Sequence, residues 1–517
     1  MTLAAIFTAA VAREPNAVAI IDGDRRLTYR QWQDEIRHLA GGLSAMGLVP
    51  GDHLVCVLSN RYEMATLYWA AQFLGLIFTP FNWRASAEEI AYVLEDAEAR
   101  AVAYEDLTRD TVTAAAAAAG IDSDRLIAVA DSAEGGVVCY AELCQGQALK
   151  APLPTDAAAI CLMLYTSGTT GRPKGVPRSG AAERWAALSC VAGLGYRQGE
   201  VSLGVMPLFH TMGIRALLMS VFVGGTFVCM PTFDTAAALR LVAEERVSAL
   251  FLVPTMFHDM VHHPAMAATN VGSVRNIAYA GMSMTSALIT ETTAAFRPEA
   301  FANFYGSSEI YTFSICPDVR INPGSAGRAG IGQTLRVVRA DPDERVGPDE
   351  TVAAGEAGEI IASMAALDGF AGYWKRPDAD EKAIRNGWYF TGDLGRVDEG
   401  GEIHVVGRVD DMIISGGENI HAEEVEEALS ACPLVLAAAV IGEADPRWGE
   451  RVVAFIEPAG AEATAETIDA YCLASGLARF KRPRAYRFVR QIPRSASGKL
   501  LRRQLRAGAY EPHPDYD

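Results

Sequence analysis

The sequence predicts an α/β fold in which a large N-terminal domain of packed α/β sheets precedes a small α+β domain. Strand-like and helical patterns alternate over residues 1–409, and this alternation is typical of largely parallel sheets. The pattern changes near residue 410, where short strands accompany a helix. The chain has 517 residues, 50% of them hydrophobic, so it can bury more than one core.

The N-terminal domain is predicted from short apolar runs that have the length of buried strands. Longer apolar patterns at helical spacing stand between them, for example over residues 62–74. Strands that alternate with helices in this way indicate parallel sheets. The predicted strands are residues 54–58, 101–104, 126–130, 160–165, 249–253 and 276–280.

The N-terminus is predicted to form an amphipathic helix and not a signal peptide. Apolar side chains recur at helical spacing at positions 3, 6, 7, 10 and 11, and no early positive charge precedes them. The most apolar internal stretch, residues 216–231, is interrupted by two glycines and is shorter than the ~20 residues of a membrane span. We therefore expect a buried helix and strand there, and no membrane partner.

The C-terminal domain is predicted to cover residues 410–517, with the boundary directly after residue 409. A strand at residues 403–406 leads into this boundary. The elements that follow are strands at residues 412–414, 435–441 and 451–456 and a helix at residues 422–429.

Charge and cysteine content exclude several classes of function. The formal net charge is -18, so the surface repels nucleic acid and anionic lipid. The nine cysteines are scattered and form no CxxC pair, which supports neither a zinc site nor a disulfide framework. We expect reduced, buried thiols in a cytoplasmic protein that has no nucleic-acid partner.

The strongest local signal is a loop rich in glycine and hydroxyl groups that follows a predicted buried strand. Its glycines let consecutive backbone N–H groups point into one concavity, which binds phosphate. The loop is not a Walker A motif, because Pro173 precedes its lysine and Gly175 follows it. A flexible linker is the alternative, but a linker needs neither the preceding strand nor the Pro-Lys-Gly end. The expected phosphate-binding residues are Thr166, Ser167, Gly168, Thr169, Thr170, Gly171 and Lys174.

From this loop onward the sequence resembles the adenylate-forming superfamily, which contains acyl-CoA synthetases, adenylation domains of peptide synthetases, and luciferases. The resemblance covers nearly the whole chain, and further motifs occur in the order that is typical of the family. It implies a large N-terminal domain and a small, mobile C-terminal one. It also implies an ATP-dependent acid–thiol ligase that forms an acyl-AMP and transfers the acyl group to coenzyme A, with ATP, CoA and Mg²⁺ as ligands.

The segment around Tyr305 has the composition of a nucleotide and metal site. Tyr305 offers a flat face for a base, and Gly306 permits close approach of the backbone. Ser308, where the family usually has threonine, and Glu309 supply hard oxygen ligands suited to Mg²⁺. The resemblance implies that Tyr305 stacks on adenine and that Glu309 contacts metal and phosphate, with Thr169 as a further metal ligand. Taken alone, the segment could be a turn with a surface glutamate.

Residues 389–393 resemble the ribose motif of the family. A carboxylate accepts hydrogen bonds from two vicinal hydroxyls, so Asp393 is expected on the ribose. By the same resemblance Arg408 contacts ribose or phosphate, and Asp410 stands at the position of the hinge residue. A single aspartate is ordinarily a surface charge, and only the motif favours these roles.

Lys499 matches the catalytic lysine of the family. Gly498 frees the backbone beside it, and the preceding serines place it in a Ser-Gly-Lys context. A preorganised cation there stabilises the negative charge that develops on the carboxylate and α-phosphate during adenylation. A lysine in a basic tail is ordinarily solvated, and the motif reverses that expectation.

A basic segment at residues 479–506 contains eleven lysines and arginines and no acidic residue. A solvated face or a nucleic-acid patch is one interpretation. The CoA nucleotide carries several phosphates and needs such a surface, and here the sequence is similar to aryl-CoA ligases of the 4-chlorobenzoate type. That resemblance implies a CoA site that consists of Arg84, Gly416, Gly417, Trp448, Phe480, Arg482 and Arg484.

The acyl pocket is predicted from residues 207–213, which match a family segment whose histidine or aromatic residue gates the acid and the thiol. His210 is therefore a candidate catalytic residue, and a core histidine is the alternative. Arg215 either faces solvent or contacts a polar ring substituent. Bulky Phe304 and Tyr311 favour a short, flat acid over a long fatty chain. The expected lining is Leu188, His210, Met212, Ala280, Met282, Phe304 and Tyr311, and Gly281 is assigned to ATP.

A benzoate-like carboxylic acid is therefore the expected small-molecule substrate. Three alternatives stay open: a ligase for medium-chain or alicyclic acids, an enzyme that loads a carrier protein, and a non-catalytic sensor on the same fold. The basic segment argues against a carrier protein, and the presence of Lys499, Glu309 and Asp393 argues against a sensor. A homodimer is compatible with the sequence.

Overall fold

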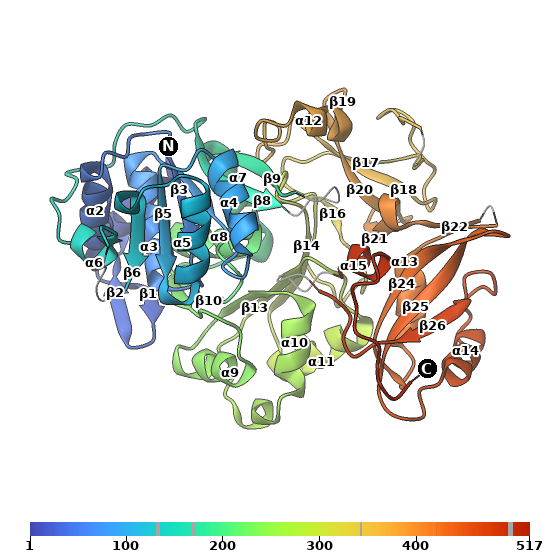
Figure 1. Cartoon of the computed structure of the whole chain (residues 1–517). Coiled ribbons are helices and arrows are strands. Elements are labelled where there is room, and N and C mark those ends of the chain that lie inside the picture. Colours follow the sequence, from blue (N-terminus) through green and yellow to red (C-terminus); the bar gives the residue numbers. More distant parts are fainter. Residues whose placement is uncertain (131–134, 167–171, 342–343, 417, 495–499, 517) are drawn as a thin grey trace. The chain divides into compact units, whose positions relative to one another are not determined.

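The computed structural model describes residues 1–130, 135–166, 172–341, 344–416, 418–494 and 500–516 (Figure 1). The chain forms two compact units. Unit 1 consists of Met1–Gly324, Ala329–Thr334 and Met364–Lys382, and unit 2 of Ser325–Arg328, Leu335–Ser363 and Ala383–Asp517. The predicted domain boundary after residue 409 lies within unit 2 and stays a prediction.

One sheet of unit 1 is largely parallel. Its strands, in spatial order, are β7 (Val138–Cys139), β6 (Leu126–Val129), β5 (Ala101–Glu105), β3 (His53–Val57), β4 (Ile77–Pro80), β8 (Ile160–Thr166) and β9 (Lys174–Ser179). Neighbouring strands from β7 to β8 are parallel, whereas β9 turns back and pairs antiparallel with β8. The loop with the predicted phosphate site joins these last two strands.

A second sheet of unit 1 is also mainly parallel. Its strands include, in spatial order, β15 (Ser314–Cys316), β14 (Ala300–Tyr305), β13 (Asn276–Ala280), β12 (Ala249–Leu252), β10 (Val201–Gly204), β11 (Thr226–Cys229), β1 (Val18–Asp22) and β2 (Arg25–Thr28). The pairs β14–β15 and β1–β2 are antiparallel, and the pairs between them are parallel. The carboxyl ends of β12, β13 and β14 therefore meet at one edge of this sheet.

The helices of unit 1 begin and end at residues that satisfy free backbone groups. Thr28 and Ser86 form capping boxes, and Gly75 ends a helix in the left-handed conformation. The helices are α1 (Leu3–Arg13), α2 (Tyr29–Ala45), α3 (Tyr62–Leu74), α4 (Ala87–Asp96), α5 (Arg109–Ala118), α6 (Tyr140–Leu143), α7 (Gly180–Leu194), α8 (Thr211–Phe222), α9 (Thr235–Glu244), α10 (Pro254–His262) and α11 (Ser286–Phe296), with α12 (Pro377–Ala383) beginning in the segment Met364–Lys382.

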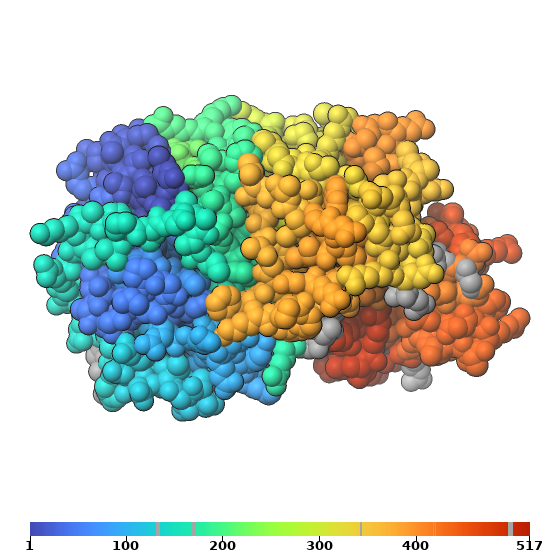
Figure 2. All heavy atoms as spheres, turned by 90° about the horizontal axis from the view of Figure 1, so that it is seen from above, coloured from blue at the N-terminus to red at the C-terminus, as the bar shows by residue number. Residues whose placement is uncertain are grey.

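Alternate side chains of the first sheet enter two different cores. Val55 and Val57 on β3 pack in the core that contains α4 and α5. Leu54 and Cys56 point to the opposite face, into the large core that contains α2 and α3. This period of two is the geometry of a strand that is buried on both faces. In the space-filling view the N-terminal elements, coloured blue to green, form a continuous, closely packed surface (Figure 2).

Unit 2 contains two smaller sheets. The first has the order β17 (Leu335–Val338), β18 (Gly358–Ser363), β20 (Trp388–Val397) and β19 (Ile384–Arg385), and β21 (Ile403–Arg408) also pairs with β20. The second has the order β23 (Glu418–Ile420), β22 (Ile413–Ser415), β25 (Gly449–Pro458) and β24 (Val435–Asp445), and β26 (Ala485–Phe488) pairs with β25. The helices α13 (Ala422–Ser430), α14 (Ala465–Ala474) and α15 (Arg502–Arg506) accompany this second sheet.

The predicted fold class is confirmed, since two mainly parallel sheets with helices make up unit 1. The predicted helix at residues 62–74 coincides with α3, and the predicted strand at residues 276–280 coincides with β13. The apolar stretch 216–231 contains the end of α8 and the whole of β11, as expected. Among the helices that the structure describes, none combines the length and apolar character needed to cross a bilayer.

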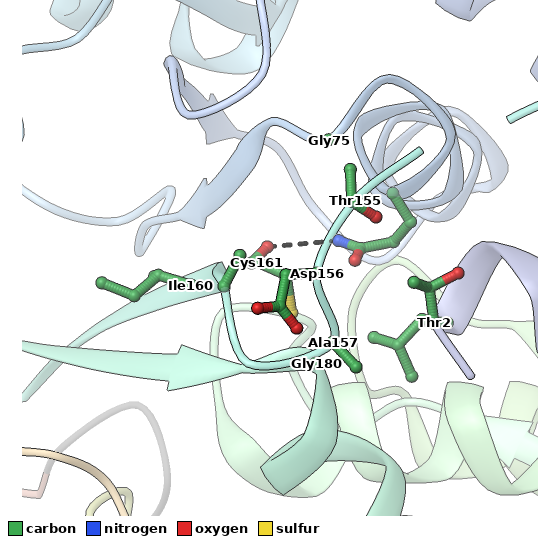
Figure 3. Close-up of a pocket in the computed structure, with 11 residues that line it drawn as sticks. Thr2, Gly75, Thr155, Asp156, Ala157, Ile160, Cys161 and Gly180 are labelled. Carbon is green, nitrogen blue, oxygen red and sulfur yellow. Dashed lines mark hydrogen bonds between the residues drawn. The ribbon is translucent and has the colours of Figure 1, made fainter. Parts of the chain in front are cut away.

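A small pocket opens in unit 1 between the start of β8 and the start of α7 (Figure 3). Its volume of about 30 Å³ is close to the share of one water molecule in the liquid. Gln72 Nε2 donates a hydrogen bond to the carbonyl oxygen of Cys161 (3.2 Å) at this pocket. Its size excludes a nucleotide or an aryl acid, so it is not the predicted active site.

Gly204 on β10 gives a test of this packing. A Cβ atom at this position would lie 2.2 Å from Cζ of Phe227 on the neighbouring strand, and the phenyl ring is fully buried. We expect Gly204→Ala to lower the free energy of unfolding by about 1–3 kcal/mol through overpacking. Urea denaturation followed by circular dichroism measures this change.

Gly272→Ala is the matched control for this substitution. A Cβ atom at Gly272 meets no atom closer than a side-chain oxygen of Asn270 at 3.3 Å. Its denaturation midpoint is expected to stay within the range of an ordinary surface change, about 0.5 kcal/mol. Equal midpoints for both variants and the parent chain would contradict the tight strand packing.

Candidate active site

The phosphate loop joins two paired strands of unit 1. Thr166 at the end of β8 and Lys174 at the start of β9 are register partners, so the loop between them is the connection of a hairpin. Thr166 and Lys174 are both half-buried. The other predicted residues of this loop, Ser167, Gly168, Thr169, Thr170 and Gly171, lie outside the described residues.

Segments from distant parts of unit 1 fix the base of this hairpin. Tyr165 donates a hydrogen bond from its hydroxyl to Oδ2 of Asp96 (2.6 Å) at the end of α4. Trp374 donates from Nε1 to the carbonyl oxygen of Asp96 (2.9 Å) and from its backbone N–H to the carbonyl oxygen of Gly175 (2.9 Å). A Cβ atom on Gly175 would lie 2.9 Å from Cβ of Trp374, so this close approach requires glycine.

Lys174 and Glu309, which are far apart in the sequence, are connected through Tyr373. The Nζ of Lys174 lies 4.2 Å from the centroid of the Tyr373 ring. The hydroxyl of Tyr373 donates a hydrogen bond to Oε1 of Glu309 (2.7 Å), whose side chain is buried. Burial lowers the pKa of Lys174, and the negative charge of Glu309 opposes this effect. The predicted phosphate and metal residues thus lie in one group.

Tyr373 is a site residue that the motifs did not identify. The local signal for it was the aromatic pair with Trp374, which directly precedes the charged residues Lys375 and Arg376. The two residues contact different segments. Tyr373 orients the carboxylate of Glu309, and Trp374 binds strand β9, which follows the predicted phosphate loop.

The turn after β14 places the predicted adenine and metal residues. Tyr305 ends the strand, and its ring lies 5.1 Å from that of Phe313. A Cβ atom on Gly306 would lie 2.1 Å from the carbonyl oxygen of Tyr311, which explains the glycine. The backbone N–H of Glu309 donates to Oγ of Ser307 (3.2 Å), so the turn is closed by its own side chain. Ser308 is half-buried in this turn.

Several predicted acyl-pocket residues gather where parallel strands end. Ala280 at the end of β13 is the register partner of Phe304 on β14, and Gly281 follows with a φ of +88°. The ring of Phe304 lies 5.6 Å from that of Phe251, which directly precedes the end of β12. Crevices at the carboxyl ends of strands are the usual ligand sites of open α/β sheets. Phe304 and Tyr311 are buried, and Met282 is half-buried.

His210 and Met212 open the helix α8. His210 is the N-cap residue, and its Nδ1 accepts a hydrogen bond from the backbone N–H of Met212 (3.4 Å). This capping contact explains the histidine structurally, and its catalytic role stays a prediction. Leu188 on α7 is 41% exposed, so it contacts solvent in this structure, and its place in the acyl pocket also stays a prediction. Arg215 is only 3% exposed, so the interpretation that it faces solvent is wrong.

The predicted ribose residues lie together in unit 2. Asp393 on β20 and Arg408 on β21 are register partners, and Nη1 of Arg408 donates to Oδ1 of Asp393 (2.6 Å). Strand β21 extends two residues beyond its predicted end because this pairing continues to Arg408. Gly392 has a φ of +71°, and a Cβ atom there would lie 2.9 Å from Nη2 of Arg408. Glycine therefore allows the ion pair to form.

The predicted hinge residue Asp410 lies in the short 3-10 helix Val409–Asp411. The next residue, Asp411, is firmly paired, since it accepts from Arg502 (3.0 Å) and Arg506 (2.9 Å) of α15. Arg502 is buried and also pairs with Glu426 on α13 (2.8 Å). Burial raises the pKa of Glu426 to about 7, although Arg502 opposes this shift. These ion pairs hold the backbone after the predicted hinge against the rest of the second sheet.

Two of the predicted CoA residues of unit 2, Gly416 and Arg484, lie beside a third, Trp448, which is 38% exposed. The backbone N–H of Gly416 donates to the carbonyl oxygen of Trp448 (2.7 Å), and the Cζ of Arg484 lies 5.8 Å from the indole centroid. Arg447 was not assigned to this group, although its Cζ lies 4.8 Å from the same ring. We call this group, with Gly416, Arg447, Trp448 and Arg484, the Trp448 cluster.

The remaining predicted CoA residues have separate surroundings. Phe480 is 42% exposed, whereas Arg482 forms an ion pair with Asp469 (3.1 Å). Arg84 belongs to unit 1, where its Cζ lies 3.8 Å from the ring of Trp83. Gly417, like Lys499, lies outside the described residues.

Among the described residues, no group of three histidine, cysteine, aspartate or glutamate side chains is arranged to hold a metal ion. A Mg²⁺ ion that binds phosphate needs one or two carboxylates and uses phosphate oxygens for the rest. The buried carboxylate of Glu309, which Tyr373 orients beside the phosphate hairpin, fits that requirement.

Comparison with known proteins identifies the family. A model described as AMP-binding enzyme matches residues 7–374, and a model described as AMP-binding enzyme C-terminal domain matches residues 424–499. The chain is 33% identical over 495 residues to a feruloyl-CoA synthase from an Amycolatopsis species, with coverage of 95% of this chain and 96% of that protein. It is 34% identical over 519 residues to a 4-chlorobenzoate–CoA ligase from an Arthrobacter species, with coverage of 97% and 95%.

A solved structure of the anthranilate CoA ligase AuaEII in complex with anthranoyl-AMP has the same fold. It superposes with a TM-score of 0.89 at 25% identity, and the match covers 98% of this chain and 97% of that chain. The family models together span both units, and the relatives match over almost their full lengths. The chain therefore belongs to the AMP-binding enzyme family, the adenylate-forming superfamily that includes the aryl-CoA ligases.

Proposed function

We propose that this chain is an ATP-dependent carboxylic acid–CoA ligase that acts on a small aromatic acid of the benzoate type. The observation that carries the proposal is the group formed by Lys174, Tyr373 and Glu309 beside the phosphate hairpin. It combines a cation and an oriented carboxylate, as the binding of a metal–nucleotide complex requires. The aryl-CoA ligases among its relatives support the same activity.

In the first half-reaction an oxygen of the substrate carboxylate attacks the α-phosphorus of ATP. A bond from this phosphorus to oxygen breaks, so that acyl-AMP forms and pyrophosphate leaves. Residues 166–171 and Lys174 would hold the phosphates, Tyr305 would stack on adenine, and Gly281, Gly306 and Ser308 would line the nucleotide. Asp393 would bind the ribose hydroxyls, with Arg408 beside it. Lys499 would stabilise the charge that develops between the two reacting groups.

A bound Mg²⁺ ion would neutralise phosphate charge in this reaction. Glu309 and Thr169 are the residues that would hold it. Tyr373 keeps the carboxylate of Glu309 oriented through a hydrogen bond of 2.7 Å.

In the second half-reaction the thiol of CoA attacks the carbonyl carbon of the acyl-AMP. The bond between this carbon and the AMP oxygen breaks, the thioester forms, and the thiol proton is released. We infer that a C-terminal domain of residues 410–517 turns about Asp410 between the two steps, which replaces Lys499 by the face with Gly416 and Gly417. The CoA nucleotide would bind the Trp448 cluster together with Phe480, Arg482 and Arg84.

The acid is proposed to be short and flat because the strand ends of unit 1 carry large rings. Phe251, Phe304 and Tyr311 are all buried there, and Ala280 and Met212 complete the apolar wall. His210 at the N-terminus of α8 would gate the approach of acid and thiol. We also propose a cytoplasmic location, because all nine cysteines are free thiols.

The direct test measures products with ATP, Mg²⁺ and benzoate, with and without CoA. We expect AMP and benzoyl-CoA in equal amounts when CoA is present, because the acyl-adenylate is consumed in the second step. Octanoate and cyclohexanecarboxylate are expected to react with kcat/KM values lower by about tenfold or more, since they fill a flat slot poorly. Release of ADP in place of AMP, or release that does not depend on the acid, would rule out the proposed reaction.

Lys499→Ala separates the two half-reactions. We expect pyrophosphate exchange to fall by about 100- to 1,000-fold, the cost of one preorganised charge contact, while preformed benzoyl-AMP still reacts with CoA at nearly the parental rate. Single-turnover measurements of each half-reaction give both numbers. Lys150→Ala removes an exposed lysine of unit 1 and serves as the control. Equal losses in both half-reactions would falsify the role proposed for Lys499.

Trp448→Ala tests the CoA surface. Loss of the indole ring removes the centre of the Trp448 cluster, so we expect the KM for CoA to rise by about 5- to 10-fold while the KM for ATP stays unchanged. Leu436→Ala removes a more exposed apolar side chain (72% exposed) from strand β24 and should change neither constant. A comparable rise in the KM for ATP counts against a separate CoA surface.

A further inference from the structure

Arg215 on α8 is a buried cation without an ion pair. Three arginines are buried among the described residues. Arg178 pairs with Glu183 (2.8 Å), and Arg502 pairs with Glu426 (2.8 Å). Arg215 is 3% exposed, and no carboxylate of the described residues forms an ion pair with it. A buried guanidinium needs hydrogen-bond acceptors for its N–H groups, so the surroundings of Arg215 call for an explanation beyond packing.

The guanidinium of Arg215 has an unused hydrogen-bond donor. Its Nη2 donates to the carbonyl oxygen of Tyr311 (2.7 Å), and its Nη1 donates to Sγ of Cys190 (3.3 Å). Within the described part of the chain, its Nε–H has no acceptor at all. A thiol is a weak acceptor, and an unsatisfied buried N–H costs free energy. The two terminal nitrogens of Arg215 therefore donate hydrogen bonds, whereas its Nε–H has no acceptor among the described residues.

The rings around Arg215 are those of the proposed acyl slot. The Cζ of Arg215 lies 5.1 Å from the ring centroid of Tyr311 and 5.8 Å from those of Phe304 and Phe251. On α8 it follows Met212 by three residues, so the two side chains share one face of the helix. The Nε–H of Arg215 thus lies among aromatic rings, where the hydroxyl of Tyr311 is the other polar group.

The surrounding charges decide what kind of group this donor suits. Two carboxylates, Glu183 and Asp368, are buried in the same region and interact electrostatically with Arg215 and Arg178. Glu183 accepts from Arg178 (2.8 Å), and Asp368 accepts from the backbone N–H of Thr312 (3.1 Å). The charges of these two arginines and two carboxylates therefore already sum to zero. An anionic substituent would add an uncompensated buried charge, whereas a neutral oxygen would satisfy the N–H at no such cost.

We propose that Arg215 is a specificity-determining residue that donates a hydrogen bond to a neutral oxygen substituent, a hydroxyl or methoxyl group, on the ring of the aryl acid. This inference rests on the proposed function, because it names the substrate class of the same site. A site that hydrogen-bonds a substrate oxygen rejects analogues without that oxygen more strongly than an apolar pocket rejects a missing methylene.

The test compares kcat/KM for AMP release by the full chain, at saturating ATP and CoA, over a matched panel of acids. The panel consists of 3- and 4-hydroxybenzoate, 3- and 4-methoxybenzoate, the methylbenzoates of the same size, benzoate, and isophthalate and terephthalate. We expect at least one oxygen-substituted acid to exceed its methyl counterpart by about tenfold or more, and both dicarboxylates to react poorly.

Arg215→Met should remove that preference, so that each oxygen-substituted acid and its methyl counterpart have kcat/KM values within about threefold of each other, because methionine keeps the apolar volume without the donor. Arg215→Lys should retain part of the preference, since it keeps a cationic donor without the planar geometry. Arg240→Met, which removes an exposed arginine of α9, should leave the whole profile unchanged.

Each outcome decides the proposal. Equal use of oxygen-substituted and methyl acids by the parent chain overturns it, even when Arg215→Met fails to fold. A preference for the dicarboxylates overturns the charge argument and makes Arg215 a carboxylate receptor. Equal losses for all acids in Arg215→Met and Arg215→Lys assign the arginine to structure alone. Absence of CoA-dependent AMP release with every acid is a failure of the proposed function, which is a different result.

Discussion

The contact on which the site depends is the hydrogen bond from the hydroxyl of Tyr373 to the buried carboxylate of Glu309, with Lys174 above the same ring. It joins three segments that lie far apart in the chain. A buried carboxylate is tolerated only when it is hydrogen-bonded, and a half-buried lysine needs negative charge nearby. Tyr373 supplies the hydrogen bond that Glu309 needs, and Glu309 supplies the negative charge near Lys174. A substitution at any of these three positions therefore changes the surroundings of the other two.

The position of this group depends on one antiparallel strand, β9, at the edge of an otherwise parallel sheet. Strands β3, β4, β5, β6 and β8 are parallel and buried, whereas β9 reverses direction after the phosphate loop. Because β8 and β9 pair antiparallel, their connection needs no helical crossover. Trp374 then ties the returning strand to the end of α4 through Asp96. The two strands that flank the predicted phosphate loop are thereby held by backbone and aromatic contacts.

The buried arginines of this chain have different surroundings. In unit 2 the ion pairs around Arg502 connect α15 to α13 and to Asp411, next to the proposed hinge. Each partner there has its counter-ion, so the network is a structural anchor beside the proposed hinge. In unit 1 Arg178 pairs with Glu183, whereas Arg215 forms no ion pair with a described residue and lies near three aromatic rings. We therefore assign a structural role to Arg502 and propose substrate recognition for Arg215.

The sequence by itself determined the α/β class and predicted the residue types of the candidate site. Alternating patterns located β3, α3 and β13, and the glycines, hydroxyls and carboxylates around Lys174, Glu309 and Asp393 indicated a nucleotide. Only the tertiary structure decided that Tyr373 orients Glu309, that Arg408 pairs with Asp393, and that Arg215 is buried. The physical reason is range: periodicity and turn chemistry act over a few neighbouring residues, whereas these contacts join positions that meet only when sheets and helices pack.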